Sequence, residues 1–342
     1  MWDAVLQWLP GSVRAVLARV SGEWPDRAEE IRIREGRPLE LVASNDYAFV
    51  GFDGRTSRQP DGAFRPTRDD CLKLLDRVTN HSVYTMEEQL RRGYITVPGG
   101  HRIGLAGRAV LERGAIRTLQ QIGGFNVRIA REARGCAGGV VPLLWENESR
   151  RLHHTLIVSP PQRGKTTLLR DAARLLSNGG WAGVAGAGDR ADRARKVGIV
   201  DERSEVAALV DGRPSFDVGP RTDVLDGCPK AEGMMVMIRA MSPEVLVVDE
   251  LGRPEDAEAV LEALHAGITV LATAHGRDWA DVRSRPSLAP LFEAKVFGRI
   301  VTLTPSGPTG AVLDVRDAEG RRLETPPAPA RPVNIRSLGG ST

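Results

Sequence analysis

The sequence predicts an α/β protein in which a mixed α/β N-terminal domain precedes a core of parallel strands covered by helices. The chain has 342 residues, which is more than one hydrophobic core usually organises. After residue 155, short apolar runs alternate with helical segments, and the continuous apolar run Val245 to Val248 is typical of a strand buried on both faces. We therefore predict domains at 1–140 and 141–304, followed by a flexible tail.

Composition excludes several classes of protein. Hydrophobic residues make up 41% of the chain, yet no apolar run reaches the roughly 18 to 20 residues that cross a bilayer. The N-terminus lacks the pattern of a signal peptide, so we expect a cytoplasmic protein. Cys71, Cys136 and Cys228 are odd in number and far apart, which predicts reduced thiols. A net charge of +3, from 47 basic and 44 acidic residues, gives nucleic-acid binding little support.

The N-terminal domain shows both helical and strand patterns. Apolar residues at helical spacing over residues 1 to 20 predict an amphipathic helix, which packs on the core or, as an alternative, lies on a membrane surface. Alternating segments at 30–36 and 38–44 predict short strands, and a helix is expected near 68–80. Residues 94–97 and 101–106, joined by Pro98-Gly99-Gly100, predict a hairpin.

The second domain is expected to alternate strands and helices. The expected elements are strands at 155–159, 245–250 and 269–275 and helices at 165–176 and 255–265. The segment 305–342 is rich in Pro, Gly, Arg and Ser and cannot bury much apolar area, so we expect it to be flexible.

The strongest motif lies between the first of these strands and its helix. Backbone N–H groups and a helix N-terminus there suit phosphate oxygens. We expect Lys165 to neutralise the β- and γ-phosphates of ATP and the Thr166 hydroxyl to hold Mg²⁺. Ser159 stands where the usual pattern begins with Gly, and an isolated GKT also occurs by chance. The predicted nucleotide-binding residues are Ser159, Pro160, Pro161, Gln162, Arg163, Gly164, Lys165, Thr166 and Thr167.

Two acids end the strand that begins at Val245. In this position the first carboxylate, Asp249, orients the Mg²⁺ shell, and the second, Glu250, can polarise the attacking water. Acids at a strand end can also be merely solvated. Because they follow a GKT motif by some 80 residues, we predict a functional pair.

Two further groups are candidates for the same chemistry. Asp201 and Glu202 follow the short apolar pair Ile199-Val200 and can help to place water or metal. His275 follows the strand at 269–273 and can sense the γ-phosphate through a hydrogen bond, although a single histidine often has a structural role.

Arg128 and Arg131 lie between the two predicted domains. They can form a solvated strand or linker face, or they can compensate charge at the γ-phosphate, because a guanidinium delivers fixed bidentate donors to a phosphoryl group. The sequence leaves both interpretations open.

The chain resembles the stage III sporulation protein AA family, a relative of the type II and type IV secretion and pilus ATPases. The resemblance extends to about residue 305. It rests on EEIRIREGRPLEL at 29–41, GYITVPGGHRIGLAGRAV at 93–110, FNVRIARE at 125–132, SPPQRGKTTLLRD at 159–171, VDERSEVA at 200–207, RTDVLDGCPKAEGMMVMIRAMSPEVLVVDELGR at 221–253 and TAHG at 273–276.

This resemblance implies a RecA-like P-loop core and an ATP-hydrolysing ring motor, expected to be a hexamer, at the cytoplasmic face of the mother-cell membrane. The motor would power a secretion-like channel to the forespore together with membrane proteins of the complex. The resemblance also implies that Asp201 and Glu202 form the acidic box, that His275 forms the histidine box, and that Arg128 and Arg131 are interdomain arginines. Gln162 and Arg163 are bulkier than the small residues usual in such loops.

Two other classes of function compete with a secretion motor. A nucleic-acid translocase or RecA-like recombination protein predicts an ATPase activity that DNA or RNA stimulates, but the chain shows no RNA-binding aromatic motif and no basic stripe. A silent scaffold predicts nucleotide binding without turnover, which the pair Asp249 and Glu250 opposes.

Overall fold

The structure, a computed structural model, describes residues 2–43, 46–79, 87–146, 151–181, 190–304 and 310–323. The chain divides into two compact units, Met1–Arg131 and Glu132–Thr342. In the described segments, no helix is both long and apolar enough to cross a membrane.

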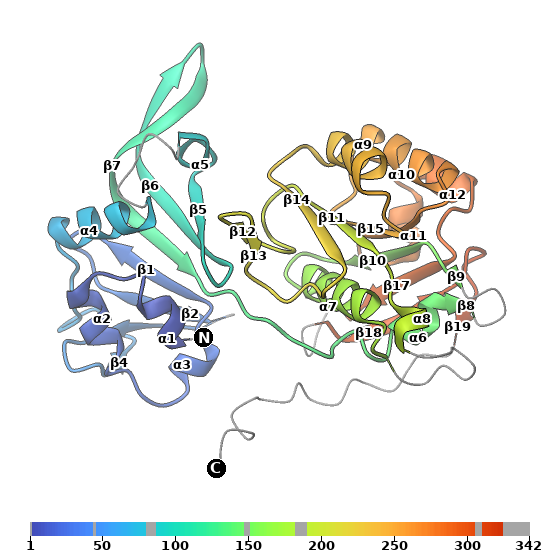
Figure 1. The fold of residues 1–342 in the computed structure, drawn as a ribbon. Helices are drawn as coiled ribbons and strands as arrows, with labels where there is room; N and C mark the ends of the chain where they lie inside the picture. The colour runs from blue at the N-terminus through green and yellow to red at the C-terminus, as the bar shows by residue number, and fades with distance from the viewer. Residues whose placement is uncertain are drawn as a thin grey trace. The chain divides into compact units, whose positions relative to one another are not determined.

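The first unit is built on an antiparallel sheet with the strand order β4-β3-β2-β1-β7-β6-β5. Figure 1 shows β6 and β7 continuing as a long two-stranded ribbon beyond their neighbours in this unit. Its elements are α1 Trp2–Leu6, α2 Gly11–Leu17, α3 Trp24–Arg27, β1 Glu30–Arg34, β2 Glu40–Ala43, β3 Asp46–Val50, β4 Thr56–Ser57, α4 Arg68–Val78, α5 Glu87–Arg92, β5 Tyr94–Val97, β6 His101–Glu112 and β7 Ala115–Arg128.

Most local predictions for this unit are confirmed. β5 pairs with β6 as the predicted hairpin, with Val97 opposite His101. α4 begins where expected because Thr67 and Asp70 form a reciprocal capping box at its first turn. The single helix predicted over residues 1 to 20 is wrong. Pro10 lacks an N–H donor and has an extended ψ of 150°, so the segment forms two short helices, α1 and α2.

The second unit contains an eight-stranded sheet with the order β14-β11-β15-β16-β10-β17-β18-β19. The strands from β14 to β17 are parallel, and β18 and β19 are antiparallel. Its principal elements are β10 Thr155–Ser159, α7 Lys165–Asn178, β11 Val197–Asp201, β14 Thr222–Asp226, α9 Lys230–Met241, β15 Val245–Val248, α10 Pro254–His265, β16 Thr269–His275, α11 Trp279–Arg283, α12 Ala289–Glu293, β17 Arg299–Leu303, β18 Val312–Arg316 and β19 Arg322–Leu323.

Smaller elements complete this unit. They are α6 Val141–Leu144, β8 Trp145–Glu146, β9 Arg151–Leu152, α8 Arg190–Arg193, β12 Leu209–Val210 and β13 Arg213–Pro214. Because β18 and β19 extend the sheet, part of the predicted flexible tail is ordered. The rest of the tail, 305–309 and 324–342, lies outside the described residues.

Helices cover both faces of this sheet, as Figure 1 shows. Successive side chains of a strand point to opposite faces. In β15, Val245 and Val247 join a core that contains Leu168 of α7, whereas Leu246 and Val248 join a core that contains Val260 of α10. The predicted parallel sheet covered by helices is therefore present, and the carboxyl ends of its parallel strands meet at one edge, where ligands bind in open α/β sheets.

The three cysteines are free thiols. Burial raises the pKa of Cys71 to about 11 and that of Cys136 to about 12. Both therefore stay protonated near neutral pH and are poor nucleophiles.

Candidate functional site

The loop of residues 160–164 joins β10 to α7 at the carboxyl edge of the sheet. Gln162 and Gly164 have φ values of 61° and 88°, so the loop turns twice through the left-handed region before α7 begins at Lys165. No side chain caps the N-terminus of α7. Its first backbone N–H groups are therefore available to an anion, which the helix dipole also favours.

Lys165 lies buried inside this loop. Its Nζ donates to the carbonyl oxygens of Ser159 and Pro160, both at 3.3 Å, and approaches His275 Nδ1 at 3.2 Å. Burial lowers the pKa of Lys165, and the charges of Asp249 and Glu250 oppose this shift in part. A buried ammonium group held by carbonyls and an imidazole gains more from a phosphate than from these neutral partners.

Asp249 is placed beside the start of α7 by two hydroxyl groups. Thr166 Oγ1 donates to Asp249 Oδ2 at 2.7 Å, and Thr273 Oγ1 donates to Oδ1. Burial raises the pKa of Asp249, although both hydrogen bonds oppose the shift. Mg²⁺ prefers hard oxygen ligands, and the Thr166 hydroxyl and the buried Asp249 carboxylate supply such oxygens side by side. These two residues therefore fit the metal.

Glu250 is the next residue and has a left-handed φ of 56°. Its N–H donates to Thr273 Oγ1 at 2.8 Å, which fixes the turn after β15. His275 Nε2 is 2.9 Å from Glu250 Oε1. Because Lys165 Nζ can only donate to Nδ1, the neutral imidazole with its hydrogen on Nε2 satisfies both contacts. His275 thus links the buried lysine to the carboxylate.

The structure separates the two acids after β11. Asp201 is buried and accepts four backbone N–H groups, from Glu205, Val206, Ala207 and Ala208, at 2.8 to 3.2 Å. Asp201 therefore shapes the loop that follows β11. Glu202 faces Lys230 instead, with Oε2 2.6 Å from the buried Nζ.

Three residues that the sequence did not indicate support or complete this site. Arg170 is buried and donates to the carbonyls of Val206 and Glu205, at 2.5 and 2.6 Å, so it fixes the loop after β11 to α7. Lys230 also lies 3.9 Å from Asp256. Arg203 Nη1 donates to Glu250 Oε2 at 2.7 Å. All three lie within runs noted in the sequence, but none was singled out, since side chains that meet from distant parts of the chain leave no local pattern.

Arg128 and Arg131 belong to the first unit and have partners there. Arg128 Nε is 3.7 Å from Glu30 Oε1. Arg131 donates to the carbonyl of Ala28 at 2.8 Å and also to the carbonyl of Asp26. These contacts describe the first unit alone. A role of either arginine at a phosphate stays a prediction.

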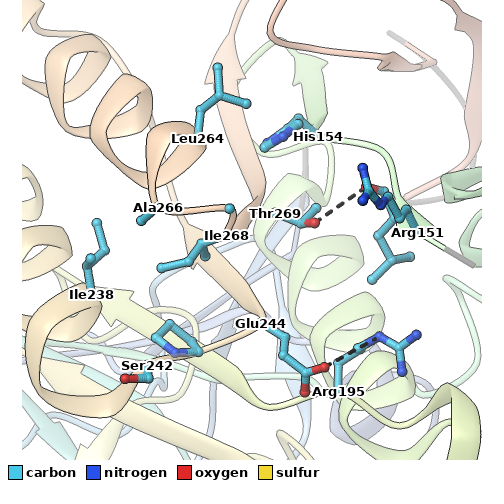
Figure 2. Close-up of a pocket in the computed structure, with 13 residues that line it drawn as sticks. Arg151, His154, Arg195, Ile238, Ser242, Glu244, Leu264, Ala266, Ile268 and Thr269 are labelled. Atoms are coloured by element: carbon cyan, nitrogen blue, oxygen red, sulfur yellow. Dashed lines mark hydrogen bonds and ion pairs between the residues drawn. The ribbon is translucent and has the colours of Figure 1, made fainter. Parts of the chain in front are cut away.

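A larger hollow lies at the opposite, amino edge of the same sheet. This cavity has a volume of about 840 Å³. Its lining, drawn in Figure 2, includes residues just before or at the first positions of β10, β11, β15 and β16. The hollow lined by Asp249, Glu250 and the loop after β11 measures only about 10 Å³. Size alone therefore does not locate the candidate site, because the smaller hollow lies among the reactive groups.

The chain is similar to a bacterial sporulation protein and, at lower identity, to a plant protein. It is 43% identical over 321 residues to Stage III sporulation protein AA of Bacillus subtilis (strain 168), which covers 94% of this chain and 97% of the relative. It is 28% identical over 294 residues to Protein SEEDLING PLASTID DEVELOPMENT 1 of Arabidopsis thaliana, covering 85% of this chain and 36% of that protein.

The fold is similar to that of the Legionella pneumophila ATPase DotB. The X-ray structure of DotB aligns with a TM-score of 0.50 at 16% identity, covering 87% of this chain and 75% of DotB. The family model described as Sporulation stage III, protein AA matches residues 2–323. The chain therefore belongs to the sporulation stage III protein AA family.

Proposed function

We propose that this chain is an Mg²⁺-dependent ATPase. One observation carries the proposal, namely the contacts that join Lys165 through His275 to Glu250 and join Thr166 to Asp249. A cation for phosphate, oxygen donors for a metal and a carboxylate for water thus lie together at the carboxyl edge of the sheet. Fold similarity to DotB, an ATPase, also supports the proposal.

The binding step uses α7 and its loop. The uncapped N-terminus of α7 and the Lys165 ammonium receive the β- and γ-phosphates, and Lys165 exchanges its carbonyl partners for phosphate oxygens. Thr166 and Asp249 would hold Mg²⁺, which neutralises charge on the phosphate oxygens when it is bound. Phosphate binding also returns charge balance to a lysine whose pKa burial has lowered.

The chemical step uses Glu250. As the oxygen of water attacks the γ-phosphorus, the bond from that phosphorus to the bridging oxygen of ADP breaks, and Glu250 accepts the proton of the water. His275 orients the carboxylate through Oε1. His275 also contacts Lys165. When a phosphate replaces that contact, His275 can shift and change the orientation of Glu250.

We further propose that this activity drives a secretion-like channel in endospore formation, between mother cell and forespore. The family membership supports a sporulation role. The resemblance to secretion ATPases supports a homo-oligomeric ring, with six subunits expected, docked on membrane proteins at the cytoplasmic face. In such a ring, Arg128 and Arg131 would reach a phosphate either on their own chain or across a subunit boundary.

Phosphate release by full-length protein in Mg²⁺ and ATP tests the proposal. Lys165→Ala should abolish turnover and the rise in unfolding midpoint that ATP causes, because the cation facing the terminal phosphates is gone. Lys196→Ala removes an exposed lysine at the amino edge and should behave as wild type. Normal hydrolysis by Lys165→Ala contradicts the site, and stimulation of the wild type by DNA favours a nucleic-acid-dependent ATPase.

A further inference from the structure

Arg203 is a cation at the site that the proposed reaction has not yet used. It follows β11, and its Nη1 donates to Glu250 Oε2 at 2.7 Å. The Arg203 side chain is 59% exposed, whereas that of Glu250 is 19% exposed. The guanidinium therefore reaches Glu250 from the solvent side. The next residue, Ser204, has a left-handed φ of 53°, a backbone conformation that is common at functional turns.

The contacts of Glu250 describe a resting arrangement. His275 Nε2 lies at Oε1, at 2.9 Å, and Arg203 Nη1 lies at Oε2. The hollow beside them, about 10 Å³, is the size that holds roughly one water molecule. A carboxylate that accepts a proton from water needs an oxygen directed at that water. Arg203 therefore occupies one of the two oxygens that can accept the proton of that water.

The other cations around the loop after β11 are committed elsewhere. Lys230 is buried between Glu202, at 2.6 Å, and Asp256, at 3.9 Å. Arg170 is buried, donates to two backbone carbonyls and stacks 3.8 Å from the ring of Phe216. Movement of either side chain would leave buried partners unsatisfied, which is costly. The Arg203 side of its pair with Glu250 is exposed, so exchanging this carboxylate for a phosphate costs less than breaking the buried contacts of Lys230 or Arg170.

We infer that Arg203 is a catalytic arginine supplied by the same chain as the phosphate loop. The inference rests on the proposed ATPase function. When ATP binds, Arg203 leaves Glu250 and donates to the γ-phosphate, whose charge and oxygens suit a guanidinium better than one carboxylate oxygen does. The same movement frees Glu250 Oε2 for the attacking water. Arg203 thus couples the presence of a γ-phosphate to the release of the base.

Two measurements on full-length protein test this inference. Phosphate release gives kcat, and displacement of a fluorescent ADP analogue gives the affinities for ATP and ADP. Arg203→Ala should lower kcat by about 10³ or more, the effect of arginines in phosphoryl transfer. It should weaken ATP binding but leave ADP binding unchanged, because Arg203 addresses the γ-phosphate. Arg203→Lys should lose less activity than Arg203→Ala, because lysine keeps the positive charge but lacks the paired N–H donors of a guanidinium.

Controls separate this role from loss of structure. Arg213→Ala removes an exposed arginine of β13 and should match wild type in kcat, both affinities and unfolding midpoint. Millimolar guanidinium ion should restore part of the activity of Arg203→Ala but not of Lys165→Ala. If Arg203→Ala is poorly folded, the ATP and ADP affinities of Arg203→Lys decide instead.

Several outcomes overturn the inference. Unchanged or faster hydrolysis by Arg203→Ala means that Arg203 only shields Glu250. Equal loss of ATP and ADP affinity means that it only shapes the pocket. A γ-phosphate defect in Arg163→Ala, or in the Arg128→Ala/Arg131→Ala double variant, with Arg203→Ala normal, assigns the role to those arginines. Absence of hydrolysis by the wild type is a different result, since it rejects the proposed ATPase function itself.

Discussion

The two edges of the eight-stranded sheet use charged residues in different ways. At the carboxyl edge, Asp201 holds backbone N–H groups, but the groups of the candidate site contact one another, as Lys165 contacts His275 and Glu250 contacts Arg203. At the amino edge, side chains mostly satisfy the backbone. His154 Nδ1 accepts the Val270 N–H at 3.1 Å, and Glu244 Oε2 accepts the Lys196 N–H at 2.8 Å.

This difference separates a reactive arrangement from a structural one. Groups that pair with each other can exchange partners when a ligand arrives, whereas groups that satisfy a strand's first N–H cannot leave without an unsatisfied backbone donor. Left-handed non-glycine residues occur at both edges, at Gln162, Ser204 and Glu250 beside the reactive groups and at Ser242 beside the larger cavity. The larger cavity therefore lies at the edge that is less suited to chemistry.

The strongest test of this difference is Glu250→Gln. The amide keeps the size of the side chain but cannot accept a proton, so hydrolysis should slow by about 10² to 10⁴. ATP binding should persist and ATP should stay trapped, which a filter-retention assay with labelled ATP measures. The matched control is Glu258→Gln, which makes the same change at an exposed glutamate of α10 and should be close to wild type in hydrolysis and in unfolding midpoint.

Normal hydrolysis by Glu250→Gln would move the base elsewhere. Glu202 is then the next candidate, because it lines the same small hollow. Its contact with the buried Lys230 at 2.6 Å makes it a less available base than Glu250. Glu202→Gln should therefore have the smaller effect on kcat.

Local patterns predicted the elements that position the site, but not all of its contacts. The strand, turn and helix around Lys165 follow from an apolar run, a glycine and a helical period within the continuous segment 155–178. Arg203 meets Glu250 across 47 positions, so only the paired strands β11 and β15 bring them together. In the predicted tail, the sequence analysis missed the short strand β18, because it does not alternate apolar and polar residues and Pro and Gly precede it.

A second, smaller effect concerns Asp249 without nucleotide or Mg²⁺. Burial raises the pKa of Asp249 in the folded state above 3.8, its ordinary value in the unfolded state. At pH values between the unfolded pKa and the raised folded pKa, the folded state therefore binds more protons than the unfolded state. Stability from this group is present at low pH and is lost as the pH rises through that window. Asp249→Asn has no carboxyl group to titrate and does not lose this stability. The unfolding free energy of Asp249→Asn relative to wild type should therefore increase as the pH rises.

Urea unfolding in the presence of EDTA, repeated in buffers from about pH 4 to about pH 7, measures the difference in unfolding free energy between Asp249→Asn and wild type. Asp223→Asn is the matched control, because Asp223 is an exposed aspartate of β14. Mg²⁺ with ATP should reverse the order and favour the wild type, since only the carboxylate binds the metal well. An advantage of Asp249→Asn that shrinks as the pH rises would contradict the assigned environment.

The smallest effect is expected at the amino edge, from Glu244→Ala. The substitution removes the acceptor of the Lys196 N–H and a carboxylate 3.9 Å from Arg195 Nε, as Figure 2 shows for the ion pair. Both contacts are partly exposed, so we expect a loss of about 0.5 to 1 kcal/mol in unfolding free energy. kcat should stay within about twofold, since no group that meets phosphate moves. A large loss of kcat would break the comparison, because β15 connects Glu244 directly to Asp249 and would then have to transmit the change between the two edges.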